Sequence, residues 1–422
     1  MQIPRRLPIL AFALLLGSIA GPGSGKFELA EAQGQVAEKP ESVPPLRIFA
    51  VERLKDLPSA ERDPAYDEYV RTVRSALDAS NYTTALLMAE KACTLWPRWR
   101  RPRIHRAAAQ LGLQRFGDAI TSAREAAKRK ADKKSPTPRP DEDETAPAYW
   151  EGLAFYRSQR FDEALAALER ACEKSPRWAE AARARAEAFF VAGRVEEAGK
   201  EYARALQLDP DVGSARDDSY YAEALVARGD LNGAIAAMQR ALRRAPYDPG
   251  LHANLGRLLR QEGNLLEAYY QFTLELLLHG VRGSYAPKAL EQAGEILDIV
   301  RADEKQPGRH ELLMVSAGLG LLDEERAHRA VHDLEHAVRI TRTATGLPQL
   351  LLGEALLRSG NAERARQQLD SLLRLEPDFV PALVLLAEAL RALGEREQAK
   401  LTLEHASSLF PTYWKLSPEQ QR

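Results

Sequence analysis

The sequence contains few cysteines and no excess of charge of either sign. Its two cysteines, Cys93 and Cys172, are too few for a disulfide framework. Each follows an alanine in helical sequence, so both are predicted to be small buried apolar residues rather than partners in a disulfide. The 59 Lys and Arg residues nearly balance the 60 Asp and Glu residues. This balance disfavours nucleic acid as the main ligand, because nucleic-acid-binding domains usually concentrate basic charge.

Motifs of the common catalytic and cofactor sites are also missing. The sequence has no Walker loop, dinucleotide-binding fingerprint, nucleophile elbow or Cys-x-x-Cys pair. Residues 21–26 are superficially similar to a phosphate loop, but they lack its spacing and do not follow a strand. We therefore predict no cofactor and no catalytic residue, and we expect that the protein is not an enzyme.

Only one apolar run stands out, at residues 9–20, and it follows Arg5 and Arg6. It is shorter than the roughly 20 apolar residues that a membrane-spanning helix needs. A basic start, a short apolar core and a small residue at Ala20 are typical of a secretory signal. Residues 1–20 are thus predicted to be a signal peptide that directs the protein to the periplasm or outside the cell. An uncleaved N-terminal anchor is the alternative.

A small residue recurs through the rest of the chain at nearly constant spacing, in the motif that reads Phe-Asp-Glu-Ala at residues 161–164. This marker alanine occurs at Ala85, Ala119, Ala164, Ala198, Ala234, Ala268, Ala330, Ala365 and Ala399. The successive intervals are 34, 45, 34, 36, 34, 62, 35 and 34 residues. Such a period, in long Ala/Leu/Arg/Glu segments without strand alternation, indicates stacked helical repeats.

Three further positions keep a fixed distance from the marker alanine. A glycine lies five residues before it in five units (Gly193, Gly229, Gly263, Gly360, Gly394), which suits a left-handed turn after a first helix. A glycine or alanine lies twelve residues before it (Ala107, Gly152, Ala186, Ala222, Gly256, Gly318, Gly353, Ala387), where two helices must cross closely. A proline lies twelve residues after it and is predicted to end the second helix (Pro97, Pro176, Pro210, Pro246, Pro377, Pro411).

This pattern resembles the tetratricopeptide repeat (TPR). The units from Gly152 to Pro176 and from Ala186 to Pro210 carry it best, and the resemblance extends over about residues 64–411. It implies an all-α fold, a right-handed α-solenoid of about nine stacked antiparallel helix pairs. The predicted organisation is a signal peptide (1–20), a flexible linker (21–62), TPR-like units 1–2 (63–133), a charged Pro-rich loop (134–146), TPR-like units 3–6 (147–280), a helical spacer (281–310), TPR-like units 7–9 (311–411) and a C-terminal cap (412–422). We expect the spacer to divide the array into blocks of six and three units.

The resemblance also implies a binding surface. In this family the concave groove is lined by first-helix residues near the second, fifth, ninth and twelfth places of each unit. The matching residues that we predict as a partner-binding groove are Arg74, Tyr149, Tyr156, Arg183, Glu187, Glu223, Arg257 and Arg260, accompanied by Leu153, Phe190, Glu354, Glu388 and Arg391. Aromatic side chains among charges of both signs suit an extended or helical peptide. The family's clamp for a terminal carboxylate is approached only by Asn254, Arg257 and Arg260, so we expect no role as a chaperone cofactor.

One helix carries a pattern of histidines that needs a separate interpretation. His328, His332 and His336 lie four residues apart, and residues 332–336 spell the H-x-x-E-H order of some zinc peptidases. A catalytic zinc site needs a third protein ligand and an open position. Relative to marker Ala330, the histidines fall between the buried positions, so we expect a solvent-facing polar stripe and no metal site. A zinc-dependent hydrolase that uses these three histidines is the alternative.

These observations favour a non-catalytic scaffold in the cell envelope that binds protein or peptide partners during assembly or secretion of envelope components. A second alternative is a glycan-binding scaffold in which Tyr149 and Tyr156 stack on sugars, with a polysaccharide as the partner. We expect no nucleic-acid partner and no transmembrane segment beyond the possible signal anchor.

Overall fold

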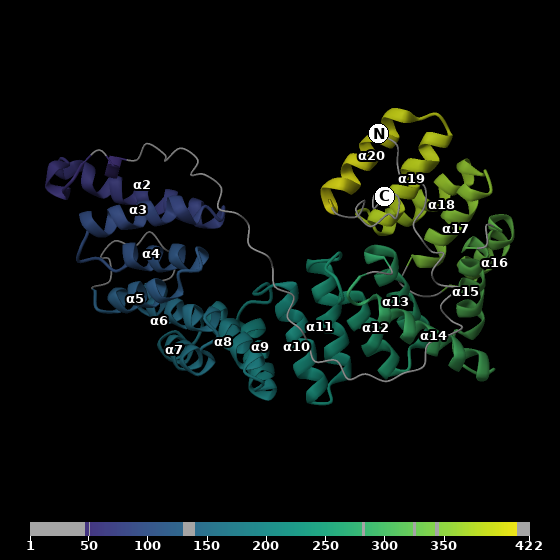
Figure 1. The fold of residues 1–422 in the computed structure, drawn as a ribbon, viewed down its shortest axis with the longest axis horizontal. Coiled ribbons are helices and arrows are strands. Elements are labelled where there is room, and N and C mark those ends of the chain that lie inside the picture. Colours follow the sequence, from purple (N-terminus) through teal and green to yellow (C-terminus); the bar gives the residue numbers. More distant parts are fainter. Residues whose placement is uncertain are drawn as a thin grey trace. The chain divides into compact units, whose positions relative to one another are not determined.

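The computed structural model describes residues 47–49, 51–129, 140–280, 283–323, 326–341 and 346–411. Within these ranges the chain forms 19 α-helices, α2 to α20, and two short 3₁₀ turns, with no strand. Figure 1 shows the helices following one another as antiparallel pairs. The predicted all-α solenoid of helix pairs is confirmed. No described helix has the length and apolar character required to cross a bilayer.

The chain divides into two compact units, which we treat separately. The N-terminal unit (residues 27–230) contains α2 (Ser59–Asp78), α3 (Tyr82–Leu95), α4 (Arg101–Gly112), α5 (Phe116–Ala127), α6 (Pro140–Arg157), α7 (Phe161–Lys174), α8 (Ala179–Val191), α9 (Val195–Leu208) and α10 (Ala215–Ala227). The C-terminal unit (residues 231–422) contains α11 (Leu231–Arg244), α12 (Leu251–Glu262), α13 (Leu265–His279), α14 (Ala286–Ala302), α15 (Arg309–Asp323), α16 (Ala327–Ile340), α17 (Leu347–Arg358), α18 (Ala362–Leu375), α19 (Val380–Ala392) and α20 (Arg396–Leu409).

The small residues of the repeat lie where the two helices of a pair cross. All nine marker alanines have a solvent exposure of 0%. In the same helix pairs, the glycine twelve residues before the marker alanine lies in the first helix. It faces the side chain that lies four residues after the marker alanine in the second helix. A Cβ atom added to Gly152 would lie 2.6 Å from Leu168 Cγ, and one added to Gly353 would lie 2.8 Å from Leu369 Cδ2. Helix spacing within these pairs therefore depends on the absence of a side chain at the glycine.

The turn inside each pair has the left-handed backbone that the sequence predicted at five glycines, with φ between 78° and 94° at Gly193, Gly229, Gly263, Gly360 and Gly394. The same position is left-handed in three units that have no glycine there. Ser80, Gln114 and Gln159 have φ of 58°, 60° and 61°. The turn is thus a property of the repeat geometry, and glycine only makes it less costly.

Proline ends the second helices as predicted. The six second helices that precede a repeat proline (α3, α7, α9, α11, α18 and α20) each end two residues before it. The aromatic residue two positions after the proline is partly buried at Trp99, Trp178 and Phe379. Tyr413, the fourth such residue in the sequence, lies outside the described residues.

The prediction that residues 21–62 are entirely a flexible linker is wrong at its C-terminal end. Short 3₁₀ turns form at Arg47–Phe49 and Leu54–Asp56, and α2 begins at Ser59. Ile48 is completely buried and Leu57 is 6% exposed, and both belong to the core cluster of α2 and α3. These apolar side chains cover the first helix pair, which has no preceding repeat to do so. Residues 1–46, which contain the predicted signal peptide, lie outside the described residues.

The predicted loop at residues 134–146 is also wrong in part, because α6 begins at Pro140. Proline is tolerated at the first position of a helix, where its missing N–H would have no partner. Residues 130–139 of this segment lie outside the described residues.

The predicted spacer contains a single helix, α14, which packs on α13 and also contacts α12 and α15. It therefore joins the helix pairs on either side of it, and the expected division into blocks at residues 281–310 is wrong. The division into two units falls between Asp230 and Leu231 instead. The predicted cap at residues 412–422 lies outside the described residues.

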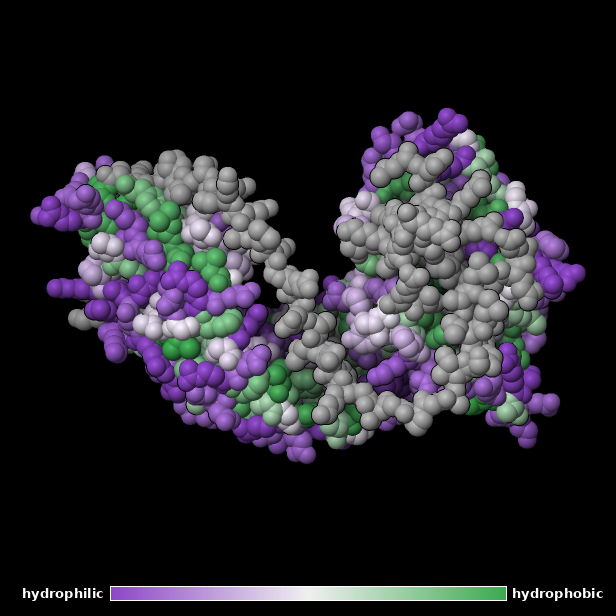
Figure 2. All heavy atoms as spheres, in the orientation of Figure 1, coloured by the Kyte–Doolittle hydropathy of each residue, from purple (hydrophilic) through white to green (hydrophobic). Residues whose placement is uncertain are grey.

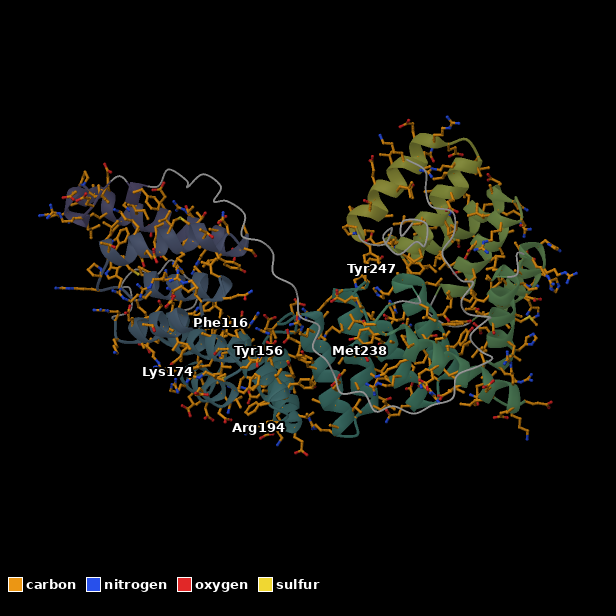
Figure 3. All side chains as sticks on the ribbon, in the orientation of Figure 1. Phe116, Tyr156, Lys174, Arg194, Met238 and Tyr247 are labelled. Atoms are coloured by element: carbon orange, nitrogen blue, oxygen red, sulfur yellow. The ribbon has the colours of Figure 1, made fainter. Side chains whose placement is uncertain are left out.

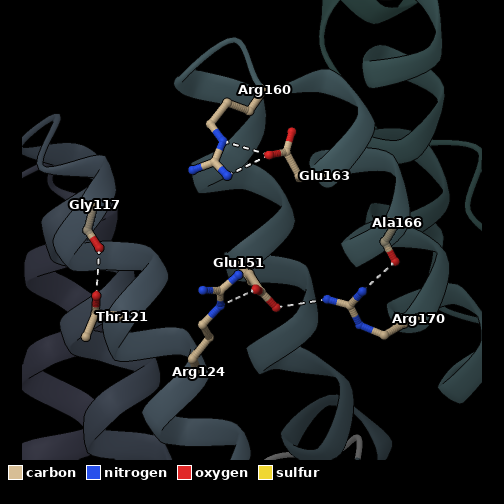
Figure 4. Close-up of polar contacts among 8 residues, drawn as sticks. All are labelled: Gly117, Thr121, Arg124, Glu151, Arg160, Glu163, Ala166 and Arg170. Carbon is tan, nitrogen blue, oxygen red and sulfur yellow. Dashed lines mark hydrogen bonds and ion pairs between the residues drawn. The ribbon is translucent and has the colours of Figure 1, made fainter.

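In the N-terminal unit, close contacts join each first helix to the first helix of the next pair, from α2 through α4, α6 and α8 to α10. Polar bridges link neighbouring pairs as well. Glu151 of α6 accepts hydrogen bonds from Arg124 of α5 at 2.7 Å and from Arg170 of α7 at 2.9 Å (Figure 4). The first helices thus form a continuous wall along one side of this unit.

Candidate functional site

The residues predicted to line a groove come together on three first helices of the N-terminal unit. Tyr156 of α6 donates a hydrogen bond from its hydroxyl to Oε1 of Glu187 on α8, at 3.0 Å. The guanidinium of Arg183, one turn earlier on α8, lies 3.3 Å from the other oxygen of Glu187. Tyr156 is labelled in Figure 3. Three of the predicted residues, Tyr156, Arg183 and Glu187, therefore contact one another.

The same Arg183 reaches the next repeat. Its Nη1 donates to Oδ1 of Asp217 on α10 at 3.1 Å, and the Asp217 side chain is 8% exposed. The second oxygen of Asp217 accepts from the backbone N–H of Ser214 at 2.8 Å, and forms the capping box that starts α10. One guanidinium thus bridges two carboxylates and fixes three successive first helices.

Aromatic rings extend this network on both sides. Phe190 of α8 stacks on Tyr220 of α10 with 4.2 Å between ring centroids and an angle of 15°. Tyr149 of α6 packs against Trp178 at 4.7 Å. Both members of the Phe190–Tyr220 pair remain partly exposed. We call the set formed by Tyr149, Tyr156, Arg183, Glu187, Phe190, Asp217 and Tyr220 the α6–α8–α10 patch.

Burial controls the ionisation of these groups. Burial and the Glu187 carboxylate raise the pKa of Tyr156, so its hydroxyl remains a proton donor. Burial lowers the pKa of Arg183, but Asp217, Tyr149 and Glu187 more than offset this and raise it overall. Burial also raises the pKa of Tyr202 on α9, whose hydroxyl has no hydrogen-bond partner among the described residues although the side chain is 2% exposed. The patch therefore keeps the Tyr156 hydroxyl protonated and the Arg183 guanidinium positively charged.

The other predicted groove residues lie apart from this patch or at its edge. Glu223 lies on α10, one turn after Tyr220, and is partly buried. Arg74 is exposed on α2, far along the same unit. Arg257 and Arg260 belong to α12 of the C-terminal unit, where Arg257 is exposed and Arg260 pairs with Gln292 and Glu295 of α14. Of the eight residues in our predicted site, four form one connected cluster.

In the C-terminal unit, of the accompanying residues, Glu354 of α17 is buried and Glu388 of α19 is partly buried. Burial raises the pKa of Glu354, which pairs with Arg358. Burial and the neighbouring Glu354 raise the pKa of Glu388. Arg391 is exposed on α19.

Sequence reasoning missed Asp217 and Tyr220. Neither falls at a groove place of the repeat, since they lie at the third and sixth places of their unit. A signal for Asp217 was present, because Ser214 three residues earlier forms a capping-box pair with it. That signal predicts a helix start, and it does not reveal that Arg183 binds the other carboxylate oxygen of Asp217, Oδ1.

The three histidines of α16 were expected to face solvent, and the structure agrees for His328 and His332 but not for His336. The His332 side chain is 84% exposed, and His328 is exposed too. His336 is instead partly buried and packs edge-on against His310 of α15, with 5.0 Å between ring centroids. Among the residues that the structure describes, no three His, Cys, Asp or Glu side chains lie close enough together to hold a metal ion. Cys93 and Cys172 are both free, and Cys172 is buried whereas Cys93 is partly exposed.

Comparison with protein families gives three matches, at residues 149–212, 219–258 and 356–416, each to a family described as the tetratricopeptide repeat. The first of these contains all of α7, α8 and α9. No curated protein matches the chain.

Solved structures similar to this chain include a thermophilic TPR protein of Thermus thermophilus, with 21% identity, a TM-score of 0.36, and coverage of 46% of this chain and 98% of that one. MamA of Desulfovibrio magneticus has 17% identity, a TM-score of 0.36, and coverage of 44% and 97%. YrrB, described as a TPR protein with an unusual peptide-binding site, has 18% identity, a TM-score of 0.29, and coverage of 56% and 89%.

Proposed function

Because the chain is a tetratricopeptide repeat protein, we propose that it is a non-catalytic scaffold that binds protein or peptide partners. The binding surface is the α6–α8–α10 patch on the first-helix wall of the N-terminal unit. The observation that carries this proposal is the connection of three successive repeats by Tyr156, Glu187, Arg183 and Asp217. A surface held rigid in this way loses little conformational entropy when a partner binds.

The chemistry of the patch favours a peptide over a small molecule. Phe190 and Tyr220 offer a partly exposed stacked pair that suits an aliphatic or aromatic side chain of the partner. The partly exposed Arg183 and Glu187 side chains, on the same helix as Phe190, add hydrogen-bonding groups. Alternating apolar and polar contacts over three repeats suit an extended or helical segment. Among the coloured residues in Figure 2, hydrophilic and hydrophobic side chains are mixed over the face shown, which suits a partner that makes both polar and apolar contacts.

A glycan-binding role for Tyr149 and Tyr156 is less well supported. Sugar stacking needs a free ring face, and the Tyr149 ring is engaged by Trp178 at 4.7 Å and Trp150 at 5.4 Å. The Tyr156 hydroxyl is already bound to Glu187. Titration of the purified protein with oligosaccharides and with peptides separates the two roles.

The zinc-hydrolase alternative would require His328, His332 and His336 to act together. The outward direction of His332 and the packing of His336 on His310 oppose this. Metal analysis of the purified protein, with His332→Ala as the control, tests it. One zinc per chain that disappears in the variant would support the hydrolase.

We place the scaffold in the cell envelope, where it would assist the assembly or secretion of envelope components. The support is the basic start at Arg5 and Arg6 and the apolar run at residues 9–20. A reporter that is active only outside the cytosol, fused after residue 62, tests the location. Activity that persists after removal of residues 1–20 would contradict it.

The proposed function is tested with peptides selected from a random library against the purified protein. Calorimetric titration then compares the wild type with Phe190→Ala and with Phe116→Ala, which removes another partly buried phenylalanine from the second helix α5 (labelled in Figure 3). We expect Phe190→Ala to weaken binding about tenfold or more and Phe116→Ala to leave it unchanged. Equal effects of both variants would contradict the assignment of the patch.

A further inference from the structure

The C-terminal unit contains a contact that a simple stack of repeats does not have. In such a stack each helix pair touches only its neighbours along the chain. Tyr247, in the loop between α11 and α12, instead touches Asp378 in the loop between α18 and α19 and Val380 at the start of α19, 131 and 133 residues later. Figure 3 labels Tyr247 at the point where these two parts of the unit meet.

The hydroxyl of Tyr247 makes two polar contacts there. It accepts a hydrogen bond from the backbone N–H of Val380 at 3.1 Å and donates one to the carbonyl oxygen of Asp378. Val380 is the first residue of α19, and the residue before it, Phe379, provides no side-chain cap. The first N–H groups of a helix have no partner within the helix. Tyr247 therefore supplies the cap of a helix four repeats further along the chain.

Apolar side chains support the same contact. The Tyr247 ring stacks on Phe410, with 5.1 Å between centroids and an angle of 8°. Leu278, near the C-terminal end of α13, is 1% exposed in a cluster with Val380, Leu383 and Val384 of α19. The burial of Leu278 thus involves residues more than 100 positions later. We call the set Tyr247, Leu278, Asp378, Val380 and Phe410 the closing contact.

We propose that the closing contact is a releasable latch that shuts residues 231–411 into a ring. Figure 1 shows α19 and α20 returning toward α12 and α13, as these contacts require. The inference goes beyond the proposed function and does not depend on it, because it concerns the C-terminal unit alone. While the latch is shut, the curvature of the wall formed by α12, α14, α15, α17 and α19 is fixed.

The latch is the weakest joint of the ring. It consists of the Tyr247 hydroxyl, the stacked Tyr247–Phe410 pair, whose two rings are both partly exposed, and the packing of the single side chain Leu278 on α19. The joints between neighbouring pairs bury whole helix faces, including nine completely or largely buried residues on α17 alone. Contacts that bury least surface open first in a folded protein. Opening at Tyr247 therefore precedes separation of any neighbouring pair, and it changes the curvature of the wall without unfolding a repeat.

The test measures the distance across the contact in the full-length protein. Spin labels are attached to the exposed positions Asp248→Cys, beside Tyr247, and Ser407→Cys, on α20, in a chain that also carries Cys93→Ala and Cys172→Ala. Pulsed electron spin resonance should give one short, narrow distance distribution for this chain. A broad distribution at long distance would show that the ring is not shut in solution and would overturn the proposal.

Variants then test whether the closing contact holds the ring. Tyr247→Ala with Phe410→Ala should broaden the distribution and shift it to longer distance, while helical content by circular dichroism stays unchanged. Tyr247→Phe keeps the stacked pair and loses both polar contacts, so it should give a mixture of the two distributions. Leu401→Ala, at a side chain 64% exposed on α20, is the control and should give the starting distribution.

Two results would contradict the latch. A distribution that stays short and narrow in both Tyr247 variants would show that other contacts hold the ring. A short distance between chains that carry one label each, mixed in equal amounts, would show that the contact joins two copies instead. If the double variant loses helical content, Tyr247→Phe alone decides between these results.

Discussion

The Tyr156 hydroxyl and the Glu187 carboxylate lie 3.0 Å apart and join the first helix of one repeat to the first helix of the next. Glu187 also pairs with Arg183, which in turn binds Asp217 of the following repeat. Neighbouring repeats are therefore held in register by side chains on the proposed binding wall as well as by their apolar core. A partner that binds this wall meets groups that are already ordered.

The first prediction concerns this hydrogen bond. Tyr156→Phe leaves Glu187 paired with Arg183, so no charge becomes isolated, and the free energy of unfolding should fall by about 0.5–1.5 kcal/mol. Tyr82→Phe is the matched control, since that hydroxyl makes only a long exposed contact of 3.4 Å with Ser80. Urea denaturation measures both. An equal loss in the two variants would mean that the Tyr156–Glu187 bond adds nothing.

The second prediction concerns the crossing point of α15 and α16. A Cβ atom at Gly318 would lie 2.6 Å from Leu334 Cγ, whereas one at Gly320, in the same helix, would meet no atom within 4 Å. Gly318→Ala should destabilise the protein by about 1 kcal/mol or more, because overpacking exceeds the gain in helix propensity. Gly320→Ala should stabilise it by about 0.5–1 kcal/mol. Thermal denaturation measures both variants. Midpoint temperatures that shift in the same direction in both would contradict the close crossing of α15 and α16 at Gly318.

The third prediction concerns the left-handed turn before α7. Gln159 has φ of 61°, which costs a residue with a Cβ atom about 1–2 kcal/mol. Gln159→Gly removes this cost and adds about 0.5–1 kcal/mol of chain entropy, so a net stabilisation of about 0.5–1 kcal/mol is expected. The reverse change Gly193→Gln, at φ of 78° in the next repeat, should destabilise the protein. Chemical denaturation checks both, and destabilisation by Gln159→Gly would show that glycine has no advantage in this turn.

The fourth prediction concerns pH. Burial and the nearby Glu311 raise the pKa of Glu267 on α13 from 4.5 to about 7. Between these values the folded chain holds a proton that the unfolded chain has lost, so this group makes the free energy of unfolding fall as the pH rises.

Glu267→Gln should remove this contribution. The free energy of unfolding of the variant, measured relative to that of the wild type, should rise by about 1 kcal/mol or more between pH 4.5 and pH 8. One pKa unit corresponds to about 1.4 kcal/mol. Denaturation at both pH values measures the change, with the exposed Glu262→Gln as the control. A constant difference between wild type and variant at the two pH values would contradict the raised pKa.

Much of the fold was predictable because the repeat fixes a residue's role by backbone geometry. Ala164 must be small where two helices cross, and Pro176 cannot continue a helix, so both positions are readable without knowledge of their neighbours. The helical start at Pro140 was missed, because three prolines and a run of acidic residues also describe a loop. The burial of Ile48 was missed because it depends on an end effect of the stack rather than on the repeat.

For the candidate site, the sequence predicted residues from their places within one repeat, and it did not predict contacts between different repeats. Tyr149, Tyr156, Arg183 and Glu187 were identified from their places in the repeat, and the structure brings them together. Asp217 was not predicted, since its ion pair with Arg183 depends on the distance between two repeats. The contact of Tyr247 with Val380 was not predicted either, because no local sequence pattern indicates a contact between residues 133 positions apart.

The most direct test of the central claim, that partners bind the first-helix wall of the N-terminal unit, is photo-crosslinking in intact cells. A benzophenone amino acid replaces Tyr220 in the α6–α8–α10 patch or, as the control, Phe116 on α5. The account predicts that the same protein is crosslinked from position 220 in repeated experiments, that it is not crosslinked from position 116, and that Phe190→Ala abolishes the product. Crosslinking of that protein from position 116 alone, or a product at position 220 that survives Phe190→Ala, would contradict the account.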